Sequence, residues 1–242
     1  MTILKYAAPM PGALCLTYDD LYVTNWVAAR HIFQEFDACA TFCISHMHTA
    51  NDEQIKGLHL LQDDGHEIAF HTRTHPKFGK YLRTHGLEDW LENEIDKGIE
   101  EHRALGFPAK SFASPFHSSS KESLAACAER FEVIRANGPR GVNSKNATRR
   151  IYNQTKQHKT VNCLGFADMQ KSGSPSWERQ TQLLDLLVEH EGAGVFAGHN
   201  IRATKRKGPG MYSSHRQLHR ILRLASDRGI KFITLSEFAN GG

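Results

Sequence analysis

The chain has 242 residues, a length that suits one large α/β domain or two small ones. Hydrophobic residues make up 40% of the chain, which is enough for a sizeable core, and 30 basic against 26 acidic side chains give a formal net charge of +4. This mild positive charge does not by itself indicate a nucleic-acid partner, and no run approaches the roughly 18 apolar residues that a membrane span needs.

Five cysteines lack the paired spacing of a zinc ribbon. They are Cys15, Cys39, Cys43, Cys127 and Cys163. Four of them lie in or beside apolar, strand-like runs, so we interpret them as free, buried thiols in a reducing compartment. Pro9, Pro11 and Gly12 interrupt the only apolar stretch near the start. This pattern argues against a signal peptide and predicts a cytoplasmic protein if residue 1 is the native start.

Hydrophobic periodicity predicts strands and helices that alternate along most of the chain. Strands are expected at 12–18, 38–44, 66–70, 109–114, 131–136, 159–164, 193–198 and 230–235. Helices are expected at 24–36, 51–63, 87–105, 120–130, 176–190 and 212–228. Two polar segments, 137–158 and 200–211, are expected to be loops, the first either irregular throughout or with a small hairpin. The alternation predicts a parallel sheet covered on both faces, either a barrel or a doubly wound sheet. No linker or repeat divides the chain, so we expect one catalytic domain over residues 1–242.

Two of the predicted strands end in residues that suit a catalytic metal. The first ends in the adjacent carboxylates Asp19 and Asp20, and the third delivers His71 and, four residues later, His75. The histidine pair alone is a weak signal, because the chain has 15 histidines. One carboxylate with two imidazoles makes a facial ligand set with open positions. The second carboxylate is then free to act as a base.

These pieces together resemble the polysaccharide deacetylase family, the NodB-homology carbohydrate esterases of family 4. The run Thr-Tyr-Asp-Asp at 17–20 is similar to that family's Thr-Phe-Asp-Asp motif, and 65–75 is similar to its second motif and lead-in strand. Residues 40–42 also fit. The resemblance runs from about residue 12 to the C-terminus and implies a distorted (β/α) barrel of about seven parallel strands. In such a barrel the carboxyl ends of the strands meet at one mouth, where active sites lie.

The resemblance implies a role for each of these residues. Asp19 would be the general base on metal-bound water, and Asp20, His71 and His75 would hold the metal, which is Zn²⁺ or another divalent ion such as Co²⁺, Mn²⁺ or Ni²⁺. His199, at the end of a predicted strand, would be the general acid that protonates the leaving group. The competing interpretations are a helix N-cap for the two aspartates and solvated loops for the histidines.

The family's third motif, Arg-x-Pro-Tyr, is altered in this chain. The sequence reads Pro115-Phe116-His117, with alanine where the arginine that holds the catalytic aspartate is expected. We expect Arg135 to reach the same place from the next strand; the alternative is an ordinary strand-end arginine. The backbone N–H of Phe116 would still serve the oxyanion, because that role needs no particular side chain. Pro115 and His117 are expected on the substrate side of the cleft.

The family's aspartate near a tryptophan, which supports the late histidine, has only positional candidates here, Asp168 and Trp177. Two basic segments are expected near the mouth. They comprise Arg140, Lys145, Arg149, Arg150, Lys156 and Lys159 in the first, and residues 205–210 in the second. These segments indicate either an anionic substrate or simply a solvated surface. They lack the interleaved aromatic residues of a nucleic-acid site.

The sequence therefore predicts a metal-dependent hydrolase that removes an acetyl group, in first place an N-acetyl group, from an acetylated carbohydrate that is neutral or anionic. Two alternatives remain: an amidase or imidase of a small non-carbohydrate amide, and a carbohydrate-binding homologue that has lost catalysis. No nucleic-acid partner and no membrane span are expected, and the sequence leaves the oligomeric state open.

Overall fold

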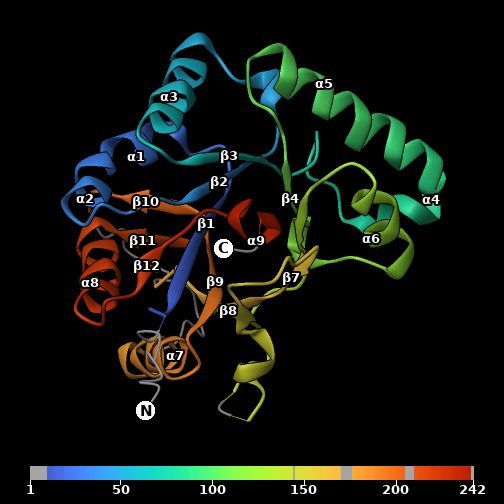
Figure 1. Cartoon of the computed structure of the whole chain (residues 1–242). Helices are drawn as coiled ribbons and strands as arrows, with labels where there is room; N and C mark the ends of the chain where they lie inside the picture. Colours follow the sequence, from blue (N-terminus) through green and yellow to red (C-terminus); the bar gives the residue numbers. More distant parts are fainter. Residues whose placement is uncertain (1–9, 144, 170–175, 205–209, 241–242) are drawn as a thin grey trace, which may run out of the picture.

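A computed structural model of the chain describes residues 10–143, 145–169, 176–204 and 210–240 (Figure 1). Its strands are β1 (Ala13–Asp20), β2 (Thr41–Ile44), β3 (Glu67–Phe70), β4 (Ser111–Ala113), β5 (Val133–Arg135), β6 (Tyr152–Asn153), β7 (Thr160–Val161), β8 (Cys163–Phe166), β9 (Gly192–Gly198), β10 (Asn200–Arg202), β11 (Tyr212–Ser214) and β12 (Lys231–Phe232). Its α-helices are α1 (Val23–Ala28), α2 (Arg30–Glu35), α3 (Asp52–Asp63), α4 (Phe78–Trp90), α5 (Lys97–Ala104), α6 (Lys121–Ala128), α7 (Trp177–Glu189), α8 (His215–Ser226) and α9 (Glu237–Asn240). Short helical turns are η1 (Met47–Thr49), the π-helical η2 (Leu91–Asp96), η3 (Pro115–His117) and η4 (Ala147–Arg150).

The main sheet follows the order β6-β9-β1-β2-β3-β4-β5-β7, with β12 beside β1 and β8 beside β9. Every pairing on the path from β9 to β7 is parallel, and β6 is antiparallel to β9. β7 pairs with β5 at one end of the path, β8 pairs with β9 at the other, and only Asn162 separates β7 from β8. One continuous segment therefore bridges the two ends of the sheet, and the predicted distorted barrel is confirmed.

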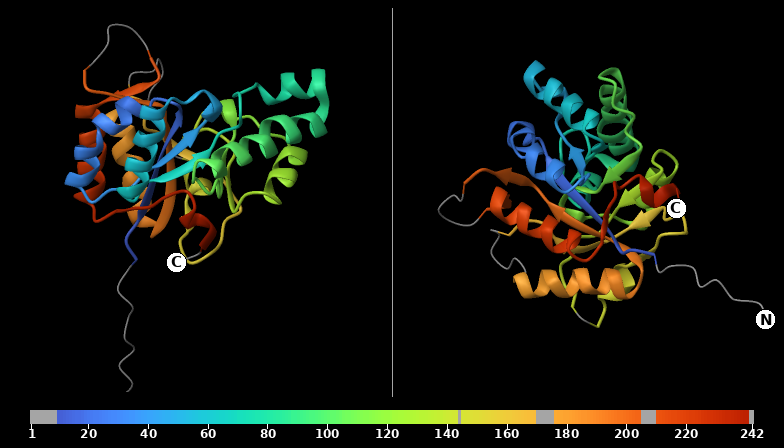
Figure 2. Two further views of the ribbon diagram at one scale, coloured as in Figure 1. Left: turned by 90° about the horizontal axis from the view of Figure 1, so that it is seen from above. Right: turned by 60° about the vertical axis from the view of Figure 1, so that its left-hand side comes forward.

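The helices lie around the outside of this sheet. Figure 1 shows α7 and α8 on one side, α3 above, and α5 and α6 on the other side. In Figure 2, α4 and α5 extend from the side of the molecule opposite α8. Within the described residues no helix is long and apolar enough to cross a bilayer.

β1 shows how the sequence builds the core on both faces of the sheet. Leu14, Leu16 and Tyr18 are buried in the layer between sheet and helices, whereas Cys15 lies in a separate cluster with residues of β5, β8 and β9. Successive side chains of a strand point to opposite faces. Asp19, which follows this alternation, is therefore on the barrel-interior side, and only 3% of it is exposed.

Several element boundaries differ from those expected. The helix predicted at 24–36 is divided into α1 and α2 at Ala29. The helix predicted at 87–105 is present and begins after Gly86, whose φ of +87° forms a kink; a further helical segment that was not predicted precedes the kink and makes α4 begin at Phe78. The described residues of the segment 137–158 form no hairpin among themselves, because their strand β6 pairs with β9. The first residues of the predicted loop 200–211 form β10, which pairs with β11. The single domain over 1–242 stays a prediction.

Candidate active site

A cleft of about 720 Å³ opens at the carboxyl ends of the barrel strands. Apart from Met211, its lining residues lie at or after the carboxyl ends of six strands, β1, β3, β4, β5, β8 and β9. The lining comprises Asp19, Asp20, His71, His75, Lys77, Phe116, His117, Asn137, Gly138, Pro139, Arg140, Arg150, Phe166, His199 and Met211. The sequence placed its candidate residues at strand ends, and the barrel brings these ends together because its strands are parallel.

Three of the lining residues form a compact set of metal-ligand atoms. One ligand atom each from Asp20, His71 and His75 lies within 4.8 Å of the others. The Nε2 atoms of the two histidines are 3.1 Å apart, and the Nε2 atom of His75 is 3.6 Å from Oδ1 of Asp20. This is the one such group among the residues that the structure describes.

The chemistry of this donor set fits a divalent cation. His71 donates a hydrogen bond from Nδ1 to the carbonyl of Ala113 at 2.6 Å, which leaves the lone pair of Nε2 directed at the cluster. Burial lowers the pKa of His71 to about 3, so the imidazole is neutral, as a metal ligand must be. Burial and the adjacent Asp19 raise the pKa of Asp20. Because the two neutral imidazoles do not balance the negative charge of Asp20, a bound cation would stabilise its ionised carboxylate.

Asp19 is held by the side chain of Arg135, the last residue of β5. The Nη2 atom of Arg135 lies 2.7 Å from both carboxylate oxygens of Asp19, and its Nη1 atom donates to Oγ1 of Thr17 at 3.1 Å. Burial by itself favours the neutral acid, but the guanidinium outweighs it and keeps the pKa of Asp19 well below its usual range. The expected contact is present; its catalytic role stays a prediction.

The register of the sheet explains why Arg135 can take this place. In the pairing of β4 with β5, Arg135 stands directly opposite Ala113, the position at which the third motif lacks its arginine. Side chains at paired positions of neighbouring strands project to the same face. Arg135 therefore enters the barrel interior at the same level as a side chain from position 113 and reaches Asp19 from one strand further along.

His199, which follows β9, is held by Asp168. The Nδ1 atom of His199 donates to Oδ2 of Asp168 at 2.6 Å, and the backbone N–H of His199 donates to Oδ1 at 3.0 Å. Burial works against the charged imidazole, but this hydrogen bond and the charge of Asp168 raise the pKa of His199 above its ordinary value. Trp177 does not take part, since it packs under Arg220; the indole of Trp26 instead donates to the His199 carbonyl at 2.8 Å.

Comparison with known proteins agrees with this geometry. A model of the polysaccharide deacetylase family matches residues 8–130, just over half of the chain. The chain belongs to the polysaccharide deacetylase family. A search of curated proteins found no match.

Solved structures of this family share the fold. A polysaccharide deacetylase homologue from Mycobacterium smegmatis is 14% identical, with a TM-score of 0.64 over 97% of this chain and 92% of that one. A family 4 carbohydrate esterase from Streptomyces lividans in complex with acetate is 14% identical, with a TM-score of 0.54 over 94% and 95%. The catalytic domain of a peptidoglycan N-acetylglucosamine deacetylase from Eubacterium rectale is 14% identical, with a TM-score of 0.52 over 95% and 92%. At these identities the likeness establishes the fold.

The turn between the two histidines of this family member depends on a residue that the sequence did not single out. Glu94, in the π-helical turn η2, is buried, and its carboxylate accepts hydrogen bonds from both the N–H (2.8 Å) and the hydroxyl of Thr74. Its carbonyl accepts from the N–H of Arg73 at 3.0 Å. Thr72 braces the same turn by accepting from the N–H of His75 at 3.1 Å. A π-helical turn often marks a functional site, but the sequence here carries no signal that distinguishes Glu94 from its neighbours.

Strained backbone conformations gather around the cleft. Of the nine described non-glycine residues with positive φ, six lie at the mouth of the barrel: Asp20, His46, Thr72, His75, Phe116 and His117. Such conformations are unfavourable for residues with a Cβ atom and persist where the surroundings impose them, often at functional sites. The strain fixes the directions in which the ligand side chains and the turn η3 point.

The third-motif residues occupy three different environments. The Phe116 side chain is 52% exposed, and its ring centroid lies 4.6 Å from that of His75. His117 lines the cleft, as expected, and packs against Gly138, where an added Cβ would come within 2.5 Å of the imidazole. Pro115 is buried and is not among the residues that line the cleft, so its expected place on the substrate side stays a prediction.

The basic residues of the segment 137–158 and its flank do not share one surface. Arg140 and Arg150 line the cleft. Lys156 and Lys159 lie toward the amino ends of the strands, where Lys159 donates to the carbonyl of Phe131, so their expected place near the mouth was wrong. The second basic segment falls largely outside the described residues, which omit 205–209.

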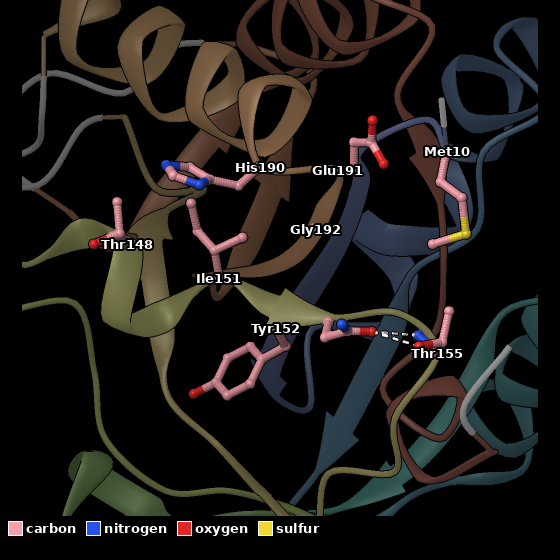
Figure 3. Close-up of a pocket in the computed structure, with 9 residues that line it drawn as sticks. Met10, Thr148, Ile151, Tyr152, Thr155, His190, Glu191 and Gly192 are labelled. Atoms are coloured by element: carbon pink, nitrogen blue, oxygen red, sulfur yellow. Dashed lines mark hydrogen bonds between the residues drawn. The ribbon is translucent and has the colours of Figure 1, made fainter. Parts of the chain in front are cut away.

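A second hollow, of about 470 Å³, lies at the opposite end of the barrel (Figure 3). It is bounded by Met10, by the segment 148–155 and by the start of β9 with His190 and Glu191. The amino ends of barrel strands generally serve stability rather than catalysis. The functional assignment therefore rests on the cleft at the carboxyl ends.

Proposed function

We propose that this chain is a metal-dependent deacetylase that hydrolyses an acetyl group, an N-acetyl amide in preference to an O-acetyl ester, from a carbohydrate. The observation that carries the proposal is the arrangement of the cleft. The donor set Asp20, His71 and His75 shares one cleft with an ionised carboxylate, Asp19, and with an imidazole whose pKa is raised, His199.

The environments of Asp19 and His199 favour opposite protonation states: Asp19 without its proton and His199 with one. The guanidinium of Arg135 keeps Asp19 ionised, so it is ready to take a proton from the attacking water. Asp168 favours the protonated form of His199, which can then give its proton to the leaving nitrogen or oxygen. Two groups whose pKa values are driven apart in one cleft are the usual mark of a base and an acid.

Asp20, His71 and His75 would hold the divalent ion, and their nitrogen and oxygen atoms suit Zn²⁺, with Co²⁺, Mn²⁺ or Ni²⁺ as alternatives. A bound ion polarises the acyl carbonyl and stabilises the developing oxyanion. Phe116 lines the same cleft, and its backbone N–H would serve as a further oxyanion donor.

The comparisons support a carbohydrate substrate. The similar proteins include an esterase of carbohydrates and an enzyme whose described substrate is peptidoglycan N-acetylglucosamine. Membership of the family supports the same class of acetylated saccharide for this chain.

Acetate release from a panel of N-acetylated and O-acetylated sugars, with added zinc, cobalt or manganese, tests the proposal. Release is expected to vanish in Asp19→Asn, which keeps the size of the side chain and removes the base. Asp96→Asn, at the half-exposed partner of Arg130, is the matched control and is expected to retain release. If the whole panel yields no acetate while zinc binds at one ion per chain, the sugar deacetylase is ruled out. A small non-carbohydrate amide, or a binding protein without catalysis, then takes its place.

We also propose that the protein works in a reducing compartment. All five cysteines are free, and four of them are buried. Cell fractionation followed by thiol labelling of the denatured chain is expected to find the protein in the cytoplasm with five labelled thiols; recovery from an oxidising compartment would contradict this.

A further inference from the structure

The walls of the cleft carry an excess of positive charge. Lys77, Arg140 and Arg150 line it, and the only carboxylates in the lining are Asp19 and Asp20. Asp19 already forms an ion pair with Arg135, so among these lining side chains only the negative charge of Asp20 remains to offset three positive charges.

These three cations are not neutralised by the protein itself. In the described parts of the chain, none of them forms an ion pair with a carboxylate, and every Asp and Glu of the sequence falls within those parts. Arg150 donates hydrogen bonds to the carbonyls of Gly138 and Cys163, each at 2.6 Å, and so holds the wall of the cleft in place. Lys77 and Arg140 are exposed and are available to a ligand.

The turn η3 contacts Lys77 directly and packs against the segment that carries Arg140. Nζ of Lys77 is 5.4 Å from the centroid of the Phe116 ring, which itself lies against His75. His117 packs against Gly138, two residues before Arg140. A ligand that reaches the metal-ligand cluster therefore enters a cleft whose lining includes the exposed Phe116 and both cations.

We propose that the cleft binds an anionic acetylated saccharide, with the negative group held by Lys77 and Arg140 and an apolar face of the sugar packed on Phe116. This inference rests on the proposed deacetylase function and names its substrate class. A concave site with one sign of charge concentrates ligands of the opposite sign. Uncompensated cations close to a metal site also oppose the binding of a dication, and an anionic substrate offsets that repulsion. A carboxylate and a phosphate offer the same oxygen acceptors to both side chains.

Calorimetric titration of the zinc-loaded chain, together with acetate release, tests the inference. The probes are N-acetylglucosamine as the neutral sugar, N-acetylmuramic acid as the carboxylate and N-acetylglucosamine 6-phosphate as the phosphate. The anionic sugars are expected to bind more tightly than the neutral one, and added salt is expected to weaken only their binding. Lys77→Gln and Arg140→Gln are each expected to lower the affinity for the anionic sugars about fivefold, the size of one exposed charge contact. Binding of the neutral sugar is expected to stay unchanged.

Lys80→Gln and Lys145→Gln are the matched controls, since both lysines are exposed and neither lines the cleft. They are expected to leave all three affinities unchanged. Equal affinity for neutral and anionic sugars, or loss of neutral and anionic binding alike in Lys77→Gln and Arg140→Gln, overturns the anion site while acetate release still supports the deacetylase. Charge-dependent binding without any acetate release supports the anion site and contradicts the deacetylase. The stronger of the two anionic probes identifies the negative group.

Discussion

Replacing Arg135 with glutamine isolates the interaction on which the base of the proposed reaction depends. Arg135 is fully buried, Asp19 is 3% exposed, and one guanidinium nitrogen lies 2.7 Å from each carboxylate oxygen. Glutamine cannot supply the positive charge, so Arg135→Gln leaves a carboxylate in the barrel interior without its counter-charge. Removing one partner of a buried ion pair typically costs about 3–5 kcal/mol. We expect a loss of that size in the free energy of unfolding at neutral pH.

The double variant Asp19→Asn/Arg135→Gln separates the unpaired charge from lost packing. It buries two amides and no charge, so it is expected to be more stable than Arg135→Gln alone, with a coupling of about 2–3 kcal/mol between the sites. Urea denaturation in the presence of a chelator measures both variants without a contribution from bound metal. Arg130→Gln is the control: its pair with Asp96 is partly exposed, and its loss is expected to cost no more than about 1 kcal/mol.

The pH dependence gives a second readout of the same pair. In the native chain the pKa of Asp19 is depressed, so its stabilising contribution is present above the unfolded pKa and is lost as the pH falls. In Arg135→Gln, burial without the guanidinium raises this pKa, so the variant is penalised as the pH rises. The difference in stability between the two proteins should therefore shrink in acid. A loss below about 1 kcal/mol, or strictly additive single and double variants, would refute the account of a charge-compensated carboxylate.

Three further outcomes follow from neighbouring residues. In Glu94→Gln the side chain cannot accept both hydrogen bonds from Thr74 in the histidine turn, so the affinity of the protein for zinc is expected to fall about 10- to 100-fold. Competition with a chromophoric chelator measures this affinity, and the exposed control Glu92→Gln is expected to leave it unchanged. Asp168→Asn removes the group that raises the pKa of His199, so the alkaline limb of the kcat/KM profile is expected to move to lower pH; an unmoved limb would exclude His199 as the acid. Burial lowers the pKa of His102 to about 4, so the free energy of unfolding, measured by urea denaturation, is expected to fall by up to about 3 kcal/mol for this group as the pH drops from about 6.5 toward 4. His102→Gln should lose that part of the slope.

The sequence predicted what is encoded locally. Alternating strands and helices gave the parallel barrel, because each element is specified by periodicity within about a dozen residues. Helix caps are local in the same way: the side chain of Ser176 accepts a hydrogen bond from the N–H of Arg179 at the start of α7, and Asn51 forms a capping box with Gln54 at the start of α3. The four site residues at the ends of β1 and β3 were also predictable, since a strand and the residues that follow it are continuous in the sequence.

Contacts between distant segments could only be guessed. Asp168 and His199 are 31 residues apart, and the aspartate had no stronger claim than its position. Glu94 and Thr74 are 20 residues apart and meet only because α4, η2 and α5 fold back along the barrel wall. The helical segment before Gly86 was also missed, although the start of the following helix was placed directly after this glycine.

The contact between Arg135 and Asp19 depends both on distant segments of the chain and on the register of neighbouring strands. Arg135 and Asp19 are separated by 116 residues, and no local pattern links them. The register of β4 and β5 nevertheless makes position 135 the lateral neighbour of position 113, where alanine leaves space beside the small residues Cys43 and Ala69. A long side chain from 135 can then occupy the interior layer that an arginine at 113 would have filled. The chemical requirement is a positive charge against the base at one level of the barrel, and either of two adjacent strands can satisfy it.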